Sequence, residues 1–158
     1  MSQLVLDVCC GPKMMWFDKH DRRAIFGDIR AQEIPLCSDG RVVRVCPDAE
    51  WDFRALPFAD ETFWHIVFDP PHLNRLGKTS WTAAKYGVLL PSWREDIAQG
   101  FSECFRVLKP NGTLIFKWSE DQIPVSDILA LTPHDPLYGH RSGRASKTHW
   151  LAFIKEES

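Results

Sequence analysis

The sequence predicts a single Rossmann-like α/β domain, with a mostly parallel sheet and an antiparallel C-terminal hairpin. Short apolar, β-branched runs alternate with segments of helical periodicity, which is typical of parallel strands joined by helices on both faces of a sheet. The last two strand-like runs, residues 137–142 and 149–154, have no helical pattern between them, so we expect them to pair antiparallel. The length of 158 residues fits one domain.

The composition is that of a globular protein that works in a reducing compartment. Apolar residues make up 44% of the chain and charged residues 25%, and the formal net charge of −2 does not by itself indicate a nucleic-acid partner. No apolar run approaches the roughly 18 residues of a membrane span, and no secretory signal is expected, which predicts a cytoplasmic protein. The five cysteines lack the spacing of a metal site, so we expect structural thiols and no metal.

The first half of the chain is expected to form three strands around two turns. A buried strand over residues 4–9 ends at Gly11-Pro12, and a short helix over 14–18 should follow. Residues 24–28 form the second predicted strand. The alternating pattern of residues 41–45 predicts a half-exposed strand, paired in a hairpin across Ser38-Asp39-Gly40.

The second half contains the clearest helical pattern. A buried strand is predicted over residues 65–68 and, after a long weakly periodic segment, a helix over 93–108. The segment Lys109-Pro110-Asn111-Gly112 should stop that helix. Another strand is expected over 113–118 and a helix over 125–131.

The tetrapeptide Asp69-Pro70-Pro71-His72 is the most informative stretch, because it directly follows the buried strand 65–68. The two prolines cannot donate backbone hydrogen bonds and force the chain out of the sheet. Asp69 should therefore sit on a rigid corner at the carboxyl end of a strand, where open α/β sheets bind ligands. Taken alone, the same segment could be only a strand-terminating turn with the Asp as a cap.

This corner resembles the Asp-Pro-Pro-Tyr signature of S-adenosylmethionine-dependent amino-methyltransferases, with His72 in place of the usual Tyr, Phe or Trp. Residues 52–63 and 105–114 are similar to segments that flank the catalytic strand in class I methyltransferases. The resemblance runs from about residue 4 to 154 and is closest to small standalone proteins of phage or prophage type. It implies one methyltransferase domain over residues 1–158, with no separate target-recognition domain and with S-adenosylmethionine as cofactor.

The resemblance also implies a set of cofactor contacts. Gly11, with the backbone of Cys9 and Cys10, would approach the methionine moiety, and Asp7 would orient this loop or bind the cofactor's amino group. Asp28, which ends the second strand 21 residues after Asp7, would bind the ribose hydroxyls. The adenine amino group would meet Asp52, with Phe53 or Trp51 against the adenine ring. A single glycine departs from the family's first loop, and Asp28 and Asp52 could instead be solvated or capping carboxylates.

The chemistry of methyl transfer to an amine explains why these residue types are grouped at the corner. The lone pair of an exocyclic amine is delocalised into its ring, and acceptors aimed at the two amine protons localise it. The Asp69 carboxylate and the Pro70 carbonyl are two such acceptors, held by Pro71. His72 could stack on the target base, although its imidazole leaves open which amine is the substrate.

Two segments carry cations interleaved with aromatic residues, a composition that suits phosphates and unstacked bases. Neither residues 71–93 nor residues 137–154 contain an acid, although both segments could also be ordinary solvated loops. A duplex base would have to be flipped into the site. The predicted substrate-binding residues are Arg75, Lys78, Trp81, Lys85, Arg141 and Arg144.

The sequence therefore predicts an N-methyltransferase that acts on an exocyclic amino group of a nucleic-acid base, with adenine N6 in DNA or RNA favoured. Cytosine N4, a guanine amino group and a protein side-chain amide remain alternatives within the enzyme class. The alternative class is a catalytically degenerate methyltransferase fold that serves as a binding protein, which the single-glycine loop and His72 would favour. Nothing in the pattern sets the oligomeric state.

Overall fold

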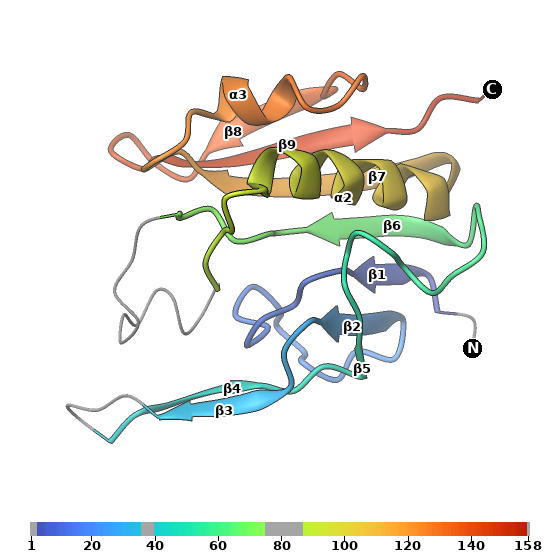
Figure 1. Ribbon diagram of the computed structural model, residues 1–158. Helices are drawn as coiled ribbons and strands as arrows, with labels where there is room; N and C mark the ends of the chain where they lie inside the picture. The colour runs from blue at the N-terminus through green and yellow to red at the C-terminus, as the bar shows by residue number, and fades with distance from the viewer. Residues whose placement is uncertain (1–2, 36–39, 75–86, 158) are drawn as a thin grey trace.

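The computed structural model describes residues 3–35, 40–74 and 87–157. They form a seven-stranded sheet with the order β5-β2-β1-β6-β7-β9-β8, next to a separate two-stranded ribbon, β3-β4 (Figure 1). The predicted fold class is confirmed: strands β5, β2, β1, β6 and β7 are parallel, and β9 and β8 continue the sheet as an antiparallel pair. In residues 3–35, 40–74 and 87–157 no helix is long and apolar enough to cross a membrane.

The strands that position the candidate site lie in the middle of the sheet. Strand β1 (Val5–Asp7) pairs with β2 (Ala24–Asp28) on one side and with β6 (Phe63–Phe68), the middle strand of the sheet, on the other. Because the strand order reverses between β1 and β6, their carboxyl ends form the topological switch point at which such sheets bind ligands. The other strands of the sheet are β5 (Ala49–Glu50), β7 (Leu108–Ser119), β8 (Tyr138–Arg141) and β9 (Thr148–Ile154).

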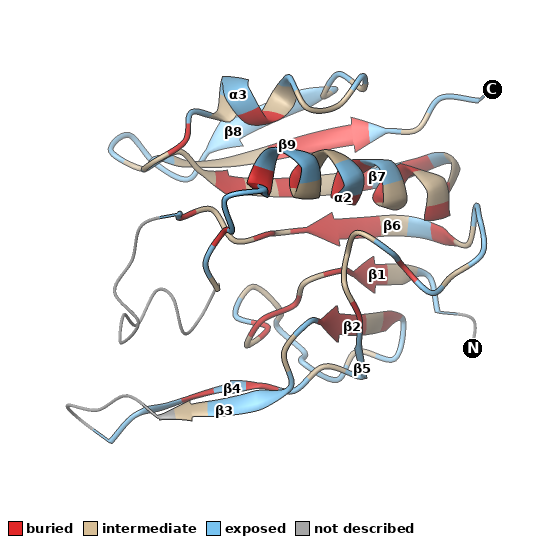
Figure 2. Cartoon of the chain, in the orientation of Figure 1, coloured by how far each residue is buried: buried red, intermediate tan, exposed pale blue. Residues whose placement is uncertain are grey.

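The main core lies on one face of the sheet, which we call the helical face. Along β7, Leu114, Phe116 and Trp118 alternate with less buried residues, as expected for a strand whose two faces differ. Helix α2 (Trp93–Val107) packs its apolar stripe on this face, and the short helix α3 (Val125–Leu129) contributes Ile128 to the same cluster (Figure 2). The helical stripe is Trp93, Ile97, Gly100, Phe101, Cys104, Phe105 and Val107.

The opposite face of the sheet is covered differently. Over β1 and β2, the loop after β1 closes it, because Cys10 and Trp16 pack against Ala24 and Phe26. Both helices of the described residues lie on the helical face, so the expected second layer of helices is not formed within residues 3–35, 40–74 and 87–157. The side chains at Lys117 of β7 and Trp150 of β9, which are cross-strand partners, belong to this opposite face.

Several of the predicted elements are confirmed, and one predicted helix is wrong. The second strand is found over the predicted residues. The predicted strand 41–45 is β4 (Val42–Val45), and it pairs antiparallel with β3 (Gln32–Pro35). The predicted turn between them lies mostly outside the described residues. The predicted helix over 14–18 is absent: residues 14 and 15 form a turn, and the rest of the segment has no regular secondary structure. A five-residue segment is too short to be helical without strong tertiary support, and the Trp16 side chain instead donates a hydrogen bond to Asp7.

The described cysteines carry no disulfide. Cys9, Cys10, Cys46 and Cys104 are free thiols, and Cys37 lies outside the described residues. Burial raises the pKa of the Cys104 thiol well above its usual value, since this side chain sits in the core under α2. Cys104 is therefore a small apolar group of the core, and Cys9 and Cys10 belong to the first loop, whereas Cys46 is exposed.

Candidate active site

A pocket opens at the carboxyl ends of β1, β2 and β6. Its cavity volume is about 210 Å³. The walls come from segments far apart in the sequence: the loop after β1, the end of β2, residues 51–53 and the corner after β6. Predicted site residues that line it are Cys9, Cys10, Gly11, Asp28, Asp52, Phe53, Asp69 and Pro71.

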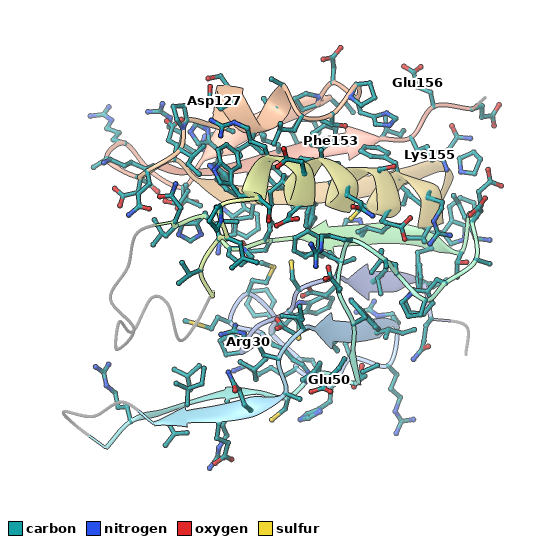
Figure 3. All side chains as sticks on the ribbon, viewed as in Figure 1. Arg30, Glu50, Asp127, Phe153, Lys155 and Glu156 are labelled. Atoms are coloured by element: carbon teal, nitrogen blue, oxygen red, sulfur yellow. The ribbon has the colours of Figure 1, made fainter. Side chains whose placement is uncertain are left out.

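The Asp28 carboxylate anchors the loop after β1 by accepting a backbone hydrogen bond from it. Gly11 has a φ of 50°, a conformation that favours glycine, and its N–H donates to Asp28 Oδ2 at 2.8 Å. The N–H of Arg30 donates to Asp28 Oδ1 at 2.9 Å. Arg30 lies between the end of β2 and the β3-β4 ribbon (Figure 3). A carboxylate has about four lone-pair directions, so Asp28 can still accept from a ligand's hydroxyls.

Asp7 lies under the loop rather than in the pocket lining. Its side chain is 1% exposed, and Trp16 Nε1 donates to Asp7 Oδ2 at 2.7 Å. Burial raises the pKa of this carboxyl to about 7, with the nearby charge of Asp69 adding to the effect and the Trp16 hydrogen bond opposing it. Asp7 thus contacts the loop through Trp16, which corresponds to the loop-orienting part of its predicted role.

The buried Asp7 carboxyl predicts a specific pH dependence of stability. Because its folded pKa of about 7 lies above the ordinary value of 3.8, its favourable contribution is present below about pH 4 and is lost as the pH rises to about 7. The free energy of unfolding of the wild type, relative to Asp7→Asn, should therefore fall by on the order of 4 kcal/mol between pH 4 and 7.5. Urea unfolding of both proteins checks this. Asp60→Asn, at an exposed position, is the control, and parallel pH curves for the wild type and Asp7→Asn would contradict the prediction.

Residues 51–53 form the wall of the pocket next to β2 and α2. The buried Trp51 donates from Nε1 to the Val8 carbonyl at 3.0 Å, which fixes its indole beside the end of β1. Asp52 accepts from Arg54, whose Nη2 lies 2.6 Å from Asp52 Oδ2, and these hydrogen bonds hold the pKa of Asp52 below its usual value. The Phe53 ring meets Phe68 edge-on at 5.3 Å. This wall offers one carboxylate and two aromatic rings to a ligand.

The Asp69 corner contains a basic partner that the sequence reading missed. Lys117, on the neighbouring strand β7, lines the same pocket, and its Nζ lies 3.5 Å from Asp69 Oδ2. Burial raises the pKa of Asp69 to about 6, while the Lys117 charge lowers it. At neutral pH Asp69 is therefore mainly a carboxylate, which is the form that accepts hydrogen bonds.

Pro70 and His72 lie behind the corner and outside the described pocket lining. The His72 ring meets Trp118 edge-on, with centroids 6.2 Å apart, and Trp118 belongs to the helical face. Burial and the Lys117 charge lower the pKa of His72 to about 4, so the ring is neutral at neutral pH. The geometry of this pocket does not place His72 against a bound base, and its predicted stacking role stays a prediction.

Several lining residues were absent from the predicted set. Ile29 and Arg30 directly follow Asp28, so their position could have been inferred from it. Lys117 could have been found as the one cation within the predicted strand 113–118. Met14, Met15 and Val88, which line the mouth of the pocket, gave no comparable signal. Met14 and Ile29 are 56% and 68% exposed, which makes the mouth apolar.

The predicted substrate-binding residues are only partly described. Arg75, Lys78, Trp81 and Lys85 lie outside the described residues. Arg141, on β8, forms an ion pair with Glu120 (Nη2 to Oε1, 3.0 Å), and Arg144 is exposed in the loop between β8 and β9.

Acids from another segment reduce the positive charge of the C-terminal hairpin. Besides the Arg141 pair, Glu120 Oε1 lies 2.9 Å from His149 Nε2, and Asp121 pairs with Lys147. The stretch 137–154 contains no acid in sequence, but residues 119–121 bring two acids to it in space. This hairpin is thus less basic than its sequence indicates.

Comparison with known proteins supports the fold and gives no family. No protein-family model and no curated protein matches the chain. Among solved structures, it is similar to a protein of Pyrococcus horikoshii (14% identity, TM-score 0.63, covering 99% of this chain and 83% of that one). It is also similar to an S-adenosylmethionine-dependent methyltransferase of Methanosarcina mazei (10% identity, TM-score 0.58, 99% and 94% covered).

A third similar structure is that of an enzyme described by a different reaction. The [4+2]-cyclase SpnF aligns with 14% identity and a TM-score of 0.53, covering 99% of this chain and 76% of that one. A fold hosts more than one chemistry, so function has to be inferred from the site. The chain thus has the fold found in class I S-adenosylmethionine-dependent methyltransferase structures.

Proposed function

We propose that this protein is an S-adenosylmethionine-dependent N-methyltransferase that acts on an exocyclic amino group of a nucleic-acid base, with adenine N6 in DNA or RNA as the favoured acceptor. The observation that carries the proposal is that Gly11, Asp28, Asp52 and Asp69 line one pocket at the topological switch point. The Asp-Pro-Pro corner and the fold of the methyltransferase neighbour support it.

The chemistry of the lining fits S-adenosylmethionine. Asp28 offers acceptors for the ribose hydroxyls, and the backbone at Gly11 lets a ligand approach closely. Asp52 offers an acceptor for the adenine amino group, next to the aromatic side chain of Phe53. The net negative charge of these carboxylates suits a cationic sulfonium. When bound, S-adenosylmethionine supplies an electrophilic methyl group.

The Asp69 corner prepares the acceptor amine. Asp69 accepts a hydrogen bond from the amine, which localises the nitrogen lone pair as the nitrogen becomes pyramidal. The Pro70 carbonyl is the second acceptor proposed for the remaining amine proton. Because Pro70 and Pro71 restrict the backbone, the carboxylate is held in place before the acceptor arrives.

Nucleic acid is the partner that follows from this acceptor. The exposed Arg144 and the cations of residues 75–85 are the proposed phosphate contacts. The acids at positions 120 and 121 limit the positive charge of the C-terminal hairpin, so we expect few phosphate contacts from it and therefore weak binding with a shallow salt dependence.

Cofactor binding tests the proposal at its first step. The wild type should bind S-adenosylmethionine with micromolar-range affinity, and Asp28→Ala should weaken it about 10- to 100-fold, because the loop at Gly11 loses its anchor and the ribose its acceptor. Isothermal titration calorimetry measures both. Asp60→Ala, which removes an exposed carboxylate outside the pocket lining, is the control. A folded wild type that does not bind the cofactor would favour the degenerate binding protein.

A further inference from the structure

A row of three side chains crosses the sheet at the rim of the pocket. Asp69 directly follows Phe68 of β6, and Phe68 is paired with Phe116 of β7, so Asp69 is level with Lys117. Lys117 is in turn the cross-strand partner of Trp150 on β9. Successive residues of a strand point to opposite faces, and this row therefore shares the face opposite α2.

The contacts within the row are close. Lys117 Nζ lies 3.5 Å from Asp69 Oδ2 and 5.3 Å from the centroid of the Trp150 ring. The Trp150 indole is itself held by a hydrogen bond from Nε1 to Ser142 Oγ at 2.7 Å. The row thus presents an anionic acceptor, a cationic donor and a fixed aromatic ring, in that order, starting inside the pocket.

This order selects among amines by hydrogen bonding. Asp69 accepts from an amino group, while the Lys117 ammonium, which has only donors, requires a lone pair beside that amino group. Adenine offers this pairing at N6 with a neighbouring ring nitrogen, and cytosine offers it at N4 with N3.

The same order rejects cationic amines. A lysine side chain or a terminal ammonium would bring a second positive charge to within a few ångströms of Lys117. At about 4 Å and an effective dielectric constant near 20, the repulsion between two unit charges is about 4 kcal/mol, which offsets the similar attraction that Asp69 alone would give a cation. The pocket would already hold the positive sulfonium of the cofactor, which adds to this penalty.

We infer that Lys117 is a specificity-determining residue of the acceptor subsite, which takes a neutral, planar amino-heteroaromatic ring whose amine adjoins a ring nitrogen. This inference rests on the proposed function and narrows its acceptor.

The test compares Lys117→Met with Lys109→Met. Lys109 is a matched control, because its Nζ also lies over a tryptophan, 5.1 Å from the Trp64 ring, but outside the pocket lining. The acceptors are single-stranded oligo(dA) and oligo(dC) and a lysine-containing peptide. We measure kcat and KM for each, together with oligo(dA) binding in the presence of S-adenosylhomocysteine.

Lys117→Met should lower kcat/KM for oligo(dA) about 10- to 100-fold, mainly through a higher KM, and weaken oligo(dA) binding similarly. Lys117→Arg should recover part of the loss, and Lys109→Met should be unchanged. A loss confined to kcat, with unchanged KM and binding, would overturn the inference and leave Lys117 as a positioning residue for Asp69. Preferential transfer by the wild type to the lysine peptide would also overturn it, with methyl transfer still standing. No transfer to any acceptor would overturn the proposed function as well.

Discussion

Asp69→Ala should lower the kcat of methyl transfer about 10²- to 10³-fold while changing the Kd of S-adenosylmethionine less than about threefold. The carboxylate is the acceptor proposed to localise the amine lone pair, and it sits on a corner that two prolines hold in place. The cofactor contacts proposed for Asp28 and Asp52 come from other segments, so binding should survive.

The measurement is single-turnover transfer from labelled S-adenosylmethionine, with calorimetry for the cofactor. Asp69→Asn is the matched variant: its amide keeps one acceptor oxygen but loses the charge, so its rate should lie between those of the wild type and Asp69→Ala. Equal rates for all three proteins would show that the corner plays no part in the reaction.

Trp51→Ala should lower the free energy of unfolding by about 3–5 kcal/mol. The indole is 8% exposed, donates to the Val8 carbonyl and meets Phe58 edge-on at 5.3 Å. It also packs tightly over β2, since a Cβ placed at Gly27 would lie 1.7 Å from Trp51 Cζ2. Removal of the ring leaves a cavity between β2, β1 and the pocket.

Urea unfolding followed by far-UV circular dichroism measures this change. Trp64 provides the control, because its ring is 50% exposed and its packing partner is the Lys109 side chain. Trp64→Ala should cost less than about 1 kcal/mol. A loss for Trp51→Ala as small as that expected for Trp64→Ala would contradict the prediction.

Much of the fold was predictable because its strands are marked by unambiguous local patterns. The strand at residues 24–28 and strand β9 have apolar runs that fit one secondary structure, bounded by turn residues. Asp69 could be placed for the same reason: the chain must leave the sheet at Pro70. The ends of β1, β2 and β6 then coincide because parallel strands align their carboxyl ends.

The parts that could not be predicted depend on contacts between distant segments. Residues 14–18 have helical composition, but the hydrogen bond between Trp16 and Asp7 belongs to another structure. In the sequence, Lys117 is a single cation within an apolar strand, which by itself does not indicate a site. Only the pairing of β6 with β7 brings it close to Asp69. The neutralising role of Glu120 toward Arg141 likewise needs the fold of the hairpin.

The most direct test of the account is transfer of a labelled methyl group from S-adenosylmethionine to single-stranded DNA and RNA, followed by digestion and identification of the methylated nucleoside. The account predicts a nucleoside methylated on its exocyclic amine, with N6-methyladenine favoured, and almost no product with Asp69→Ala. Label on a carbon atom or on a lysine ammonium, or no product from a folded protein that binds the cofactor, would contradict it.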